Sequence, residues 1–106
     1  MQLMTQELQR TLPPLYANEA HGMKALALVH YFTPDSNWDW YASEFDGIDL
    51  FFGLVKGFEL ELGYFTLSEL AQWRGTLGLP IERDLYWKPV SLQQLEKTLL
   101  NQFIAR

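Results

Sequence analysis

The chain has 106 residues, no cysteine and a formal net charge of −5, from 13 acidic and 8 basic residues. This length and a hydrophobic fraction of 48% predict one folded domain over residues 1–106, and the missing cysteines exclude disulfides, zinc–thiolate sites and thiol nucleophiles. The acidic charge argues against direct nucleic-acid binding, no apolar run approaches the roughly 20 residues of a membrane span, and a reducing, cytoplasmic compartment is expected.

A short helix and a strand are predicted in the first third of the chain. Thr5 is in position to cap the helix, Leu8 and Leu12 recur at helical spacing, and the two prolines at 13–14 end it. Residues 24–32 favour a strand, because β-branched and aromatic residues gather at its end and a turn-forming segment follows. The alanines and leucines of this segment would also suit a helix.

Three tightly connected strands are predicted in the middle of the chain, over residues 38–45, 48–55 and 58–65. The dipeptides Asp46-Gly47 and Lys56-Gly57 separate them. Asp-Gly between apolar runs is the strongest short hairpin signal, so both connections are expected to be two-residue turns.

Two further helices are predicted in the last third. Thr66–Glu69 and Ser91–Gln94 both have the capping-box pattern that starts a helix. The segment between the helices offers a short extra edge strand near Leu85–Lys88. We therefore predict an α+β fold: an antiparallel meander of four strands, or five with that edge, and three helices packed on one sheet face.

Two-residue turns also predict a register. Phe45 then faces Ile48, so Glu44 lies opposite Asp49, and Gly53 lies opposite Trp40 and leaves space for its indole. One face becomes strongly apolar and forms the core that the helices cover. Its residues are Trp38, Trp40, Ala42, Phe51, Val55, Phe58, Leu60, Leu62 and Tyr64.

The opposite face of the predicted sheet is also too apolar to be left in water. The chain's own N-terminal helix, a second copy of the protein or a partner could cover it. If it is uncovered, it is an interaction surface. The candidate interaction residues are Tyr41, Leu50, Phe52, Leu54 and Phe65.

The predicted Glu44–Asp49 pair forms a candidate acidic site with Asp46 and Tyr64. Opposed carboxylates repel each other, unless both lie in solvent at the sheet rim, one is protonated, or a cation bridges them. No cofactor is predicted, apart from a divalent cation as the alternative at Glu44 and Asp49. The sequence holds no phosphate-binding glycine loop and no HExxH motif, which favours a non-enzymatic function.

Several motifs of the chain, taken together, resemble those of one protein family. This is an uncharacterised family of small bacterial proteins, a domain of unknown function carried largely on plasmids, integrative elements and prophages. The resemblance implies an accessory protein of a mobile element and supplies no catalytic residues. The motifs are Phe32–Trp38 (FTPDSNW), Trp40-Tyr41, Glu44–Gly47 (EFDG), Asp49–Val55 (DLFFGLV), Glu61–Phe65 (ELGYF) and Gly78–Tyr86 (GLPIERDLY).

We therefore expect an acidic protein-interaction module of a mobile genetic element. The resemblance implies action against a host defence system, and the acidic charge favours a basic host protein as the partner, since acidic and basic surfaces are complementary. An element-encoded partner and a homodimer are the other partner hypotheses. The alternative function is a small hydrolase or a binding protein for a metal or cationic ligand, which would use Glu44 and Asp49.

Overall fold

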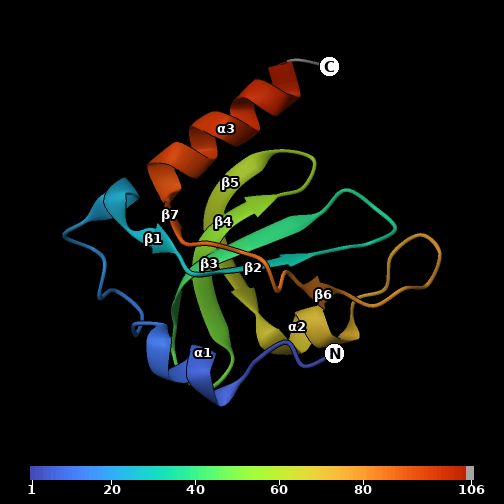
Figure 1. The fold of residues 1–106 in the computed structure, drawn as a ribbon, viewed down its shortest axis with the longest axis horizontal. Helices are drawn as coiled ribbons and strands as arrows, with labels where there is room; N and C mark the ends of the chain where they lie inside the picture. The colour runs from blue at the N-terminus through green and yellow to red at the C-terminus, as the bar shows by residue number, and fades with distance from the viewer. Residues whose placement is uncertain (105–106) are drawn as a thin grey trace.

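The computed structural model describes residues 1–104. It has the predicted α+β class, with a five-stranded antiparallel sheet, a two-stranded sheet and three α-helices (Figure 1). In chain order the elements are α1 (Gln6–Thr11), the 3-10 helix η1 (Gly22–Lys24), β1 (Leu26–Ala27), β2 (Val29–Phe32), β3 (Asp39–Phe45), β4 (Leu50–Lys56), β5 (Leu60–Thr66), α2 (Leu67–Gln72), β6 (Glu82–Arg83), β7 (Val90–Ser91) and α3 (Leu92–Ile104).

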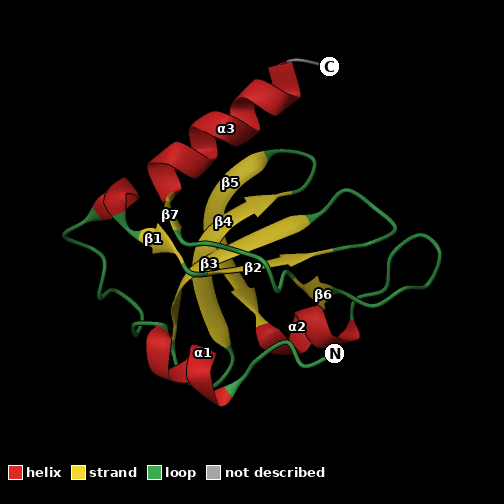
Figure 2. Cartoon of the chain, in the orientation of Figure 1, coloured by secondary structure: helices red, strands yellow, loops and turns green. Residues whose placement is uncertain are grey.

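The large sheet contains the predicted meander and one added edge. Its strand order is β5-β4-β3-β2-β6, and β1 pairs with β7 in the small sheet (Figure 2). The predicted strand over residues 24–32 is therefore divided between two sheets. The extra edge strand is Glu82–Arg83, earlier in the chain than the segment near Leu85–Lys88 that was predicted. None of the helices in residues 1–104 has the length and hydrophobicity of a membrane span.

The three predicted helix starts are confirmed. Each helix begins after a hydroxyl side chain that accepts a hydrogen bond from the backbone N–H three residues later, which satisfies one of the free amides of the first turn. The bonds join Thr5 to Leu8, Thr66 to Glu69 and Ser91 to Gln94, each at 3.1 Å.

The first hairpin turn is longer than the predicted two residues. One oxygen of the Asp46 carboxylate accepts hydrogen bonds from the backbone N–H groups of residues 48–50, at 2.7–3.0 Å. This Asx-type arrangement closes a loop between Phe45 and the start of β4. Phe45 consequently pairs with Phe51, and both side chains lie in the same core.

A β-bulge then changes the direction of one side chain. The register between β3 and β4 shifts at Ser43, so Glu44 turns to the face opposite Phe45. Glu44 pairs with Phe52. The predicted opposition of Glu44 and Asp49 is therefore wrong.

The second hairpin turn is also longer, and its three-residue shift inverts β5. Lys56 pairs with Leu60, where the predicted turn had Val55 facing Phe58. Because side chains alternate along a strand, an odd shift moves each residue of β5 to the other face. Phe65 thus lies in the core beside Phe51, and its predicted place on the opposite, interaction face is wrong.

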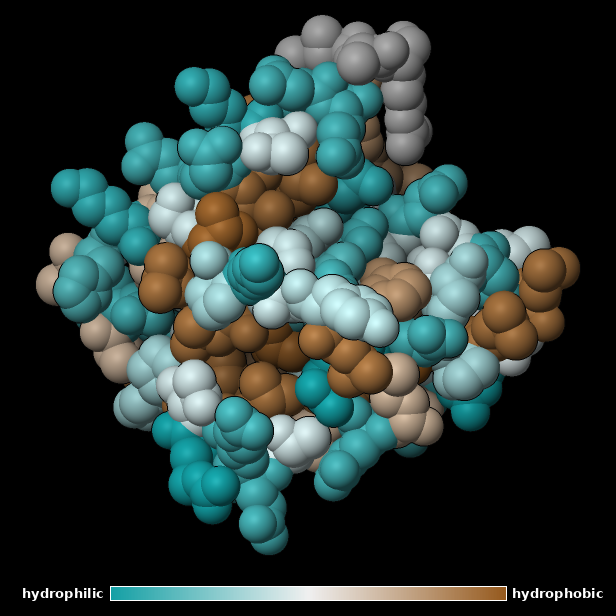
Figure 3. All heavy atoms as spheres, in the orientation of Figure 1, coloured by the Kyte–Doolittle hydropathy of each residue, from teal (hydrophilic) through white to brown (hydrophobic). Residues whose placement is uncertain are grey.

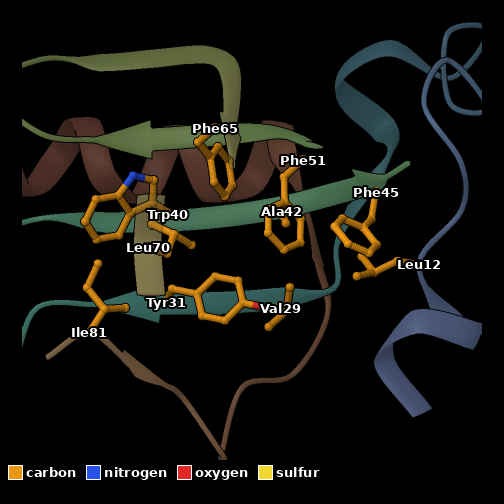
Figure 4. Close-up of a cluster of buried hydrophobic side chains, with 10 residues drawn as sticks. All are labelled: Leu12, Val29, Tyr31, Trp40, Ala42, Phe45, Phe51, Phe65, Leu70 and Ile81. Carbon is orange, nitrogen blue, oxygen red and sulfur yellow. The ribbon is translucent and has the colours of Figure 1, made fainter. Parts of the chain in front are cut away.

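Two hydrophobic cores lie on opposite faces of the sheet. We call the face that carries Trp40 and Phe51 the first face. α1 and α2 contribute to its core, which Figure 4 shows as a line of aromatic rings with Leu70 of α2 against them. The buried members of this core are Leu12, Val29, Tyr31, Trp40, Ala42, Phe45, Phe51, Phe65, Leu70 and Ile81.

The second face carries Tyr41 and Leu54, the neighbours of first-face residues along each strand. α3 covers part of it, through Leu92, Leu95 and Leu99. The prediction that all helices pack on one sheet face is therefore wrong. In Figure 3, hydrophobic side chains also gather across the middle of the molecule beneath α3, between hydrophilic borders.

Candidate functional site

A cavity of about 370 Å³ opens on the second face, where α3 leaves the sheet uncovered. Strands β3, β4 and β5 form its floor, and the segment that precedes β1 forms a wall. Aromatic and aliphatic side chains dominate the lining, together with two carboxylates. The residues used below are Tyr16, Glu19, Glu44, Phe52, Leu62 and Tyr64.

Glu44 is the buried carboxylate of the cavity, with only 5% of its surface exposed. Its two oxygens accept hydrogen bonds from the backbone N–H groups of Tyr16, at 3.0 Å, and Asn18, at 2.9 Å. Two charge-assisted bonds offset part of the cost of burial. An ionised carboxylate has about four acceptor positions, so Glu44 retains capacity for a donor from a ligand.

The loop that Glu44 holds has an unusual backbone. Tyr16 has a φ of 70°, the only positive φ among the non-glycine residues 1–104. A bulky side chain in this left-handed region costs on the order of 1–3 kcal/mol and persists where surrounding contacts impose it. Here the bond from the Tyr16 amide to Glu44 is that contact, and it keeps the tyrosine ring at the cavity.

Two tyrosines lie at the mouth of the cavity. Tyr16 is 65% exposed and Tyr64 is 52% exposed. A hydrogen bond with Tyr16 is the main cause that raises the pKa of the Tyr64 hydroxyl. Burial, the Tyr16 hydroxyl and the negative charges of Glu44 and Glu19 raise it further. Tyr64 offers the cavity an aromatic ring with a polar hydroxyl.

The charge of the cavity has one sign. Glu19 and Glu44 are its ionisable acids, and none of the described residues that line it is a lysine, arginine or histidine. An acidic pocket with aromatic walls suits an organic cation, because aromatic ring faces and carboxylates both attract positive charge.

The structure brings together some of the predicted site residues. Glu44 and Tyr64, predicted as members of the acidic site, and Phe52, predicted as an interaction residue, all line this cavity. Tyr41 and Leu54 are buried beneath α3 and the neighbouring Trp87.

The other predicted acidic residues point elsewhere. Asp46 closes its own turn, and Asp49 accepts hydrogen bonds from the backbone N–H and hydroxyl of Ser68, both at 2.8 Å. Leu50, the remaining predicted interaction residue, is half-buried at the start of β4. Within residues 1–104 no three histidine, aspartate or glutamate side chains are grouped to hold a metal ion.

A second polar cluster lies on the same sheet face, and sequence reasoning missed it. Nε2 of His30 lies 2.7 Å from Asp39, and Nδ1 lies 3.0 Å from Asp84. Lys56 approaches Asp39 to 3.6 Å, and the imidazole stacks on Tyr41 with 4.4 Å between ring centroids. Each ring nitrogen of His30 therefore faces one carboxylate.

The electrostatics of this cluster follow from its partners. Burial works against the charged form of Asp84. The pKa of Asp84 is nevertheless lowered. Asp84 accepts hydrogen bonds from His30 and from the Tyr86 amide, and these bonds, together with the charge of His30, outweigh the effect of burial. The cluster joins β2, β3 and the segment after β6. Asp84 is 54 residues from His30 along the chain, and no sequence motif links the two.

The fold and the cavity define the class: a small α+β protein with a hydrophobic core on each face of its sheet and an acidic, aromatic pocket on the second face. The family described as Protein of unknown function (DUF2958) matches residues 3–97. The chain belongs to this family. No curated protein and no solved structure matches it.

Proposed function

We propose that this protein is a non-enzymatic interaction module that binds a basic segment of a partner protein at the cavity of Glu44. The observation that carries the proposal is the composition of that cavity. It combines a buried carboxylate with spare acceptor positions, tyrosine and phenylalanine surfaces, and no basic side chain among its described lining.

A lysine or arginine side chain has the matching chemistry. Its aliphatic stem can lie along Phe52 and Leu62, while its charged end reaches towards Glu44. The two tyrosines can contact the cation through their ring faces, and Glu19 adds attraction at the mouth. The overall charge of −5 favours the approach of a basic partner over longer distances.

The resemblance to proteins carried on mobile elements suggests where such a partner is found. A cytoplasmic, basic host protein that takes part in defence against mobile elements is the partner class we propose. An element-encoded protein with the same basic surface is equally compatible with the cavity. The hydrolase alternative depended on opposed carboxylates of Glu44 and Asp49, which the observed register separates.

Affinity capture tests the proposal. Tagged wild-type protein is incubated with bacterial lysate, and a retained protein is purified and measured against it by calorimetry. We expect one-to-one binding that weakens as salt increases, since charge attraction is screened. Tyr64→Ala should weaken binding about tenfold or more if the cavity is the contact.

Ile48→Ala is the matched control, because Ile48 is 82% exposed and lies in the turn outside the cavity. It should leave the affinity within about twofold. Equal loss with both variants, or binding that does not respond to salt, would contradict the proposal.

A further inference from the structure

The two edges of the large sheet differ sharply. At one end, β6 has two residues, and the N-terminal segment covers it: the Arg83 amide contacts the Met1 sulfur at 3.0 Å, and the Arg83 guanidinium donates to the Gln2 carbonyl at 3.1 Å. At the other end, β5 has seven residues and pairs with β4 along its whole length without a bulge. Proteins usually protect long edge strands by shortening, bulging or covering them.

The outer side of β5 is accessible. Leu62 is 45% exposed and Tyr64 is 52% exposed, and Glu61 is also exposed. A Cβ built on Gly63 meets nothing within 4 Å, so the first-face side of the strand is open at its middle. Figure 1 shows β5 and β6 at the two ends of the sheet, with α3 over only the upper part of β5.

The same edge forms a rim of the cavity. Leu62 and Tyr64 point to the second face and line the cavity, whereas Glu61 and Gly63 point to the first face. A strand placed beside β5 would carry every second side chain next to the cavity. Its alternate side chains would lie next to Glu61.

The charge of the edge selects between a second copy and a different partner. Glu59 and Glu61 lie on or next to β5, Glu19 and Glu44 lie in the adjoining cavity, and β5 has no basic residue. A second copy paired through β5 would bring the same carboxylates to the contact again, and like charges across strands are destabilising. A basic strand would neutralise them.

We propose that the partner binds by strand addition: a basic, extended segment of the partner protein pairs with the free edge of β5 and places lysine or arginine side chains at the cavity and beside Glu61. This inference rests on the proposed function and specifies its geometry. Backbone hydrogen bonds along β5 supply affinity, and the two acidic positions select the basic sequence.

Peptide selection followed by backbone methylation tests the geometry. A display library of random peptides of about ten residues, long enough to span β5, is selected on the wild-type protein, and the most enriched peptide is synthesised. We expect lysine or arginine in both alternating sets of residues, one basic side chain facing the cavity and one facing Glu61. Two methylated forms are then made, each with N-methyl groups on one set of alternate residues, because each set directs its amides to one side of a strand.

Strand addition predicts that one methylated form loses about tenfold or more in affinity while the other stays within about twofold. Amide hydrogen exchange of residues 60–66 should slow when the unmodified peptide binds. Glu61→Gln should weaken binding several-fold, whereas Glu7→Gln on α1 is the control and should have no effect.

Three other results would overturn the inference, in different ways. Basic peptides that respond to Tyr64→Ala but tolerate both methylation patterns would leave the proposed function standing and exclude strand addition. Enrichment of acidic or neutral peptides, or of none, would overturn both. A wild-type dimer whose contact protects β5 would assign the edge to a second copy and exclude the partner strand.

Discussion

The two faces of the sheet are built from adjacent residues of the same strands, yet they differ in completeness. On the first face, Phe51 has no exposed surface and contacts Phe45, Phe65 and Tyr31, with ring centroids 4.6–5.7 Å apart. On the second face, the next residue, Phe52, is half-buried and has Tyr64 as its aromatic neighbour, at 5.2 Å.

This difference indicates which face of the sheet contributes most to stability and which face is available for binding. α1, α2 and several loops close the first face, so its aromatic side chains contribute their full burial to the free energy of unfolding. α3 and the small sheet close only part of the second face and leave the cavity beside it. Substitutions should therefore separate into those that unfold the protein and those that alter the cavity.

Replacement of neighbouring phenylalanines is the strongest test of this comparison. Phe51→Ala should lower the free energy of unfolding by about 3–5 kcal/mol, because it leaves a cavity in a closed core. Phe52→Ala should cost about 1 kcal/mol, because solvent already reaches its site. Urea denaturation of both variants measures the difference, and similar losses would show that the second face is as closed as the first.

The pairing of β3 with β4 leaves no room for a side chain at Gly53. Gly53 pairs with Ala42, and a Cβ there would collide with the backbone carbonyl of Tyr41. Gly53→Ala should cost about 2–3 kcal/mol, because backbone near the bulge must move. Gly63→Ala, directly across on β5, meets open space and should be neutral or slightly stabilising. A neutral Gly53→Ala in thermal melts would contradict the observed register.

The buried carboxylate of the second face should contribute less. Glu44→Gln should cost roughly 1–2 kcal/mol, since an amide cannot accept both backbone bonds that hold Tyr16 and Asn18. Glu19→Gln, on the same loop and exposed, should stay within about 0.5 kcal/mol. Calorimetric unfolding checks both, and equal values would mean that Glu44 does not fix the loop.

Acid should produce the smallest effect, through Asp84. Its pKa is lowered from the usual 3.8 in the folded protein, so its contribution to stability is complete above that value and is lost as the pH falls through the lowered pKa. The stability difference between wild type and Asp84→Asn, measured by urea denaturation, should therefore shrink between pH 5 and the most acid pH that the fold survives. Asp46, whose pKa is lowered by backbone hydrogen bonds, titrates equally in both proteins. If the stability difference between the two proteins grew on acidification, the pKa of Asp84 would not be lowered in the folded protein.

Sequence reasoning predicted the elements better than their alignment. The helix caps at Thr5, Thr66 and Ser91 and the meander of the central strands are local features, and all are present. The turn at Asp46 is longer than the predicted two residues because its carboxylate accepts hydrogen bonds from three backbone amides. The dipeptide Asp-Gly alone does not indicate these bonds. That longer loop and the bulge at Ser43 moved Glu44 away from Asp49.

Local sequence patterns specify the α+β class, the helix starts and the apolar side chains on both sides of the central strands, because propensity, capping and alternation act between near neighbours. Tertiary structure decided what covers each face. α3 follows β7, which pairs with β1, and packs over Tyr41 and Leu54. The cavity depends in the same way on Glu44 binding the amides of Tyr16 and Asn18, contacts between segments more than 25 residues apart, which side-chain spacing along the chain does not specify.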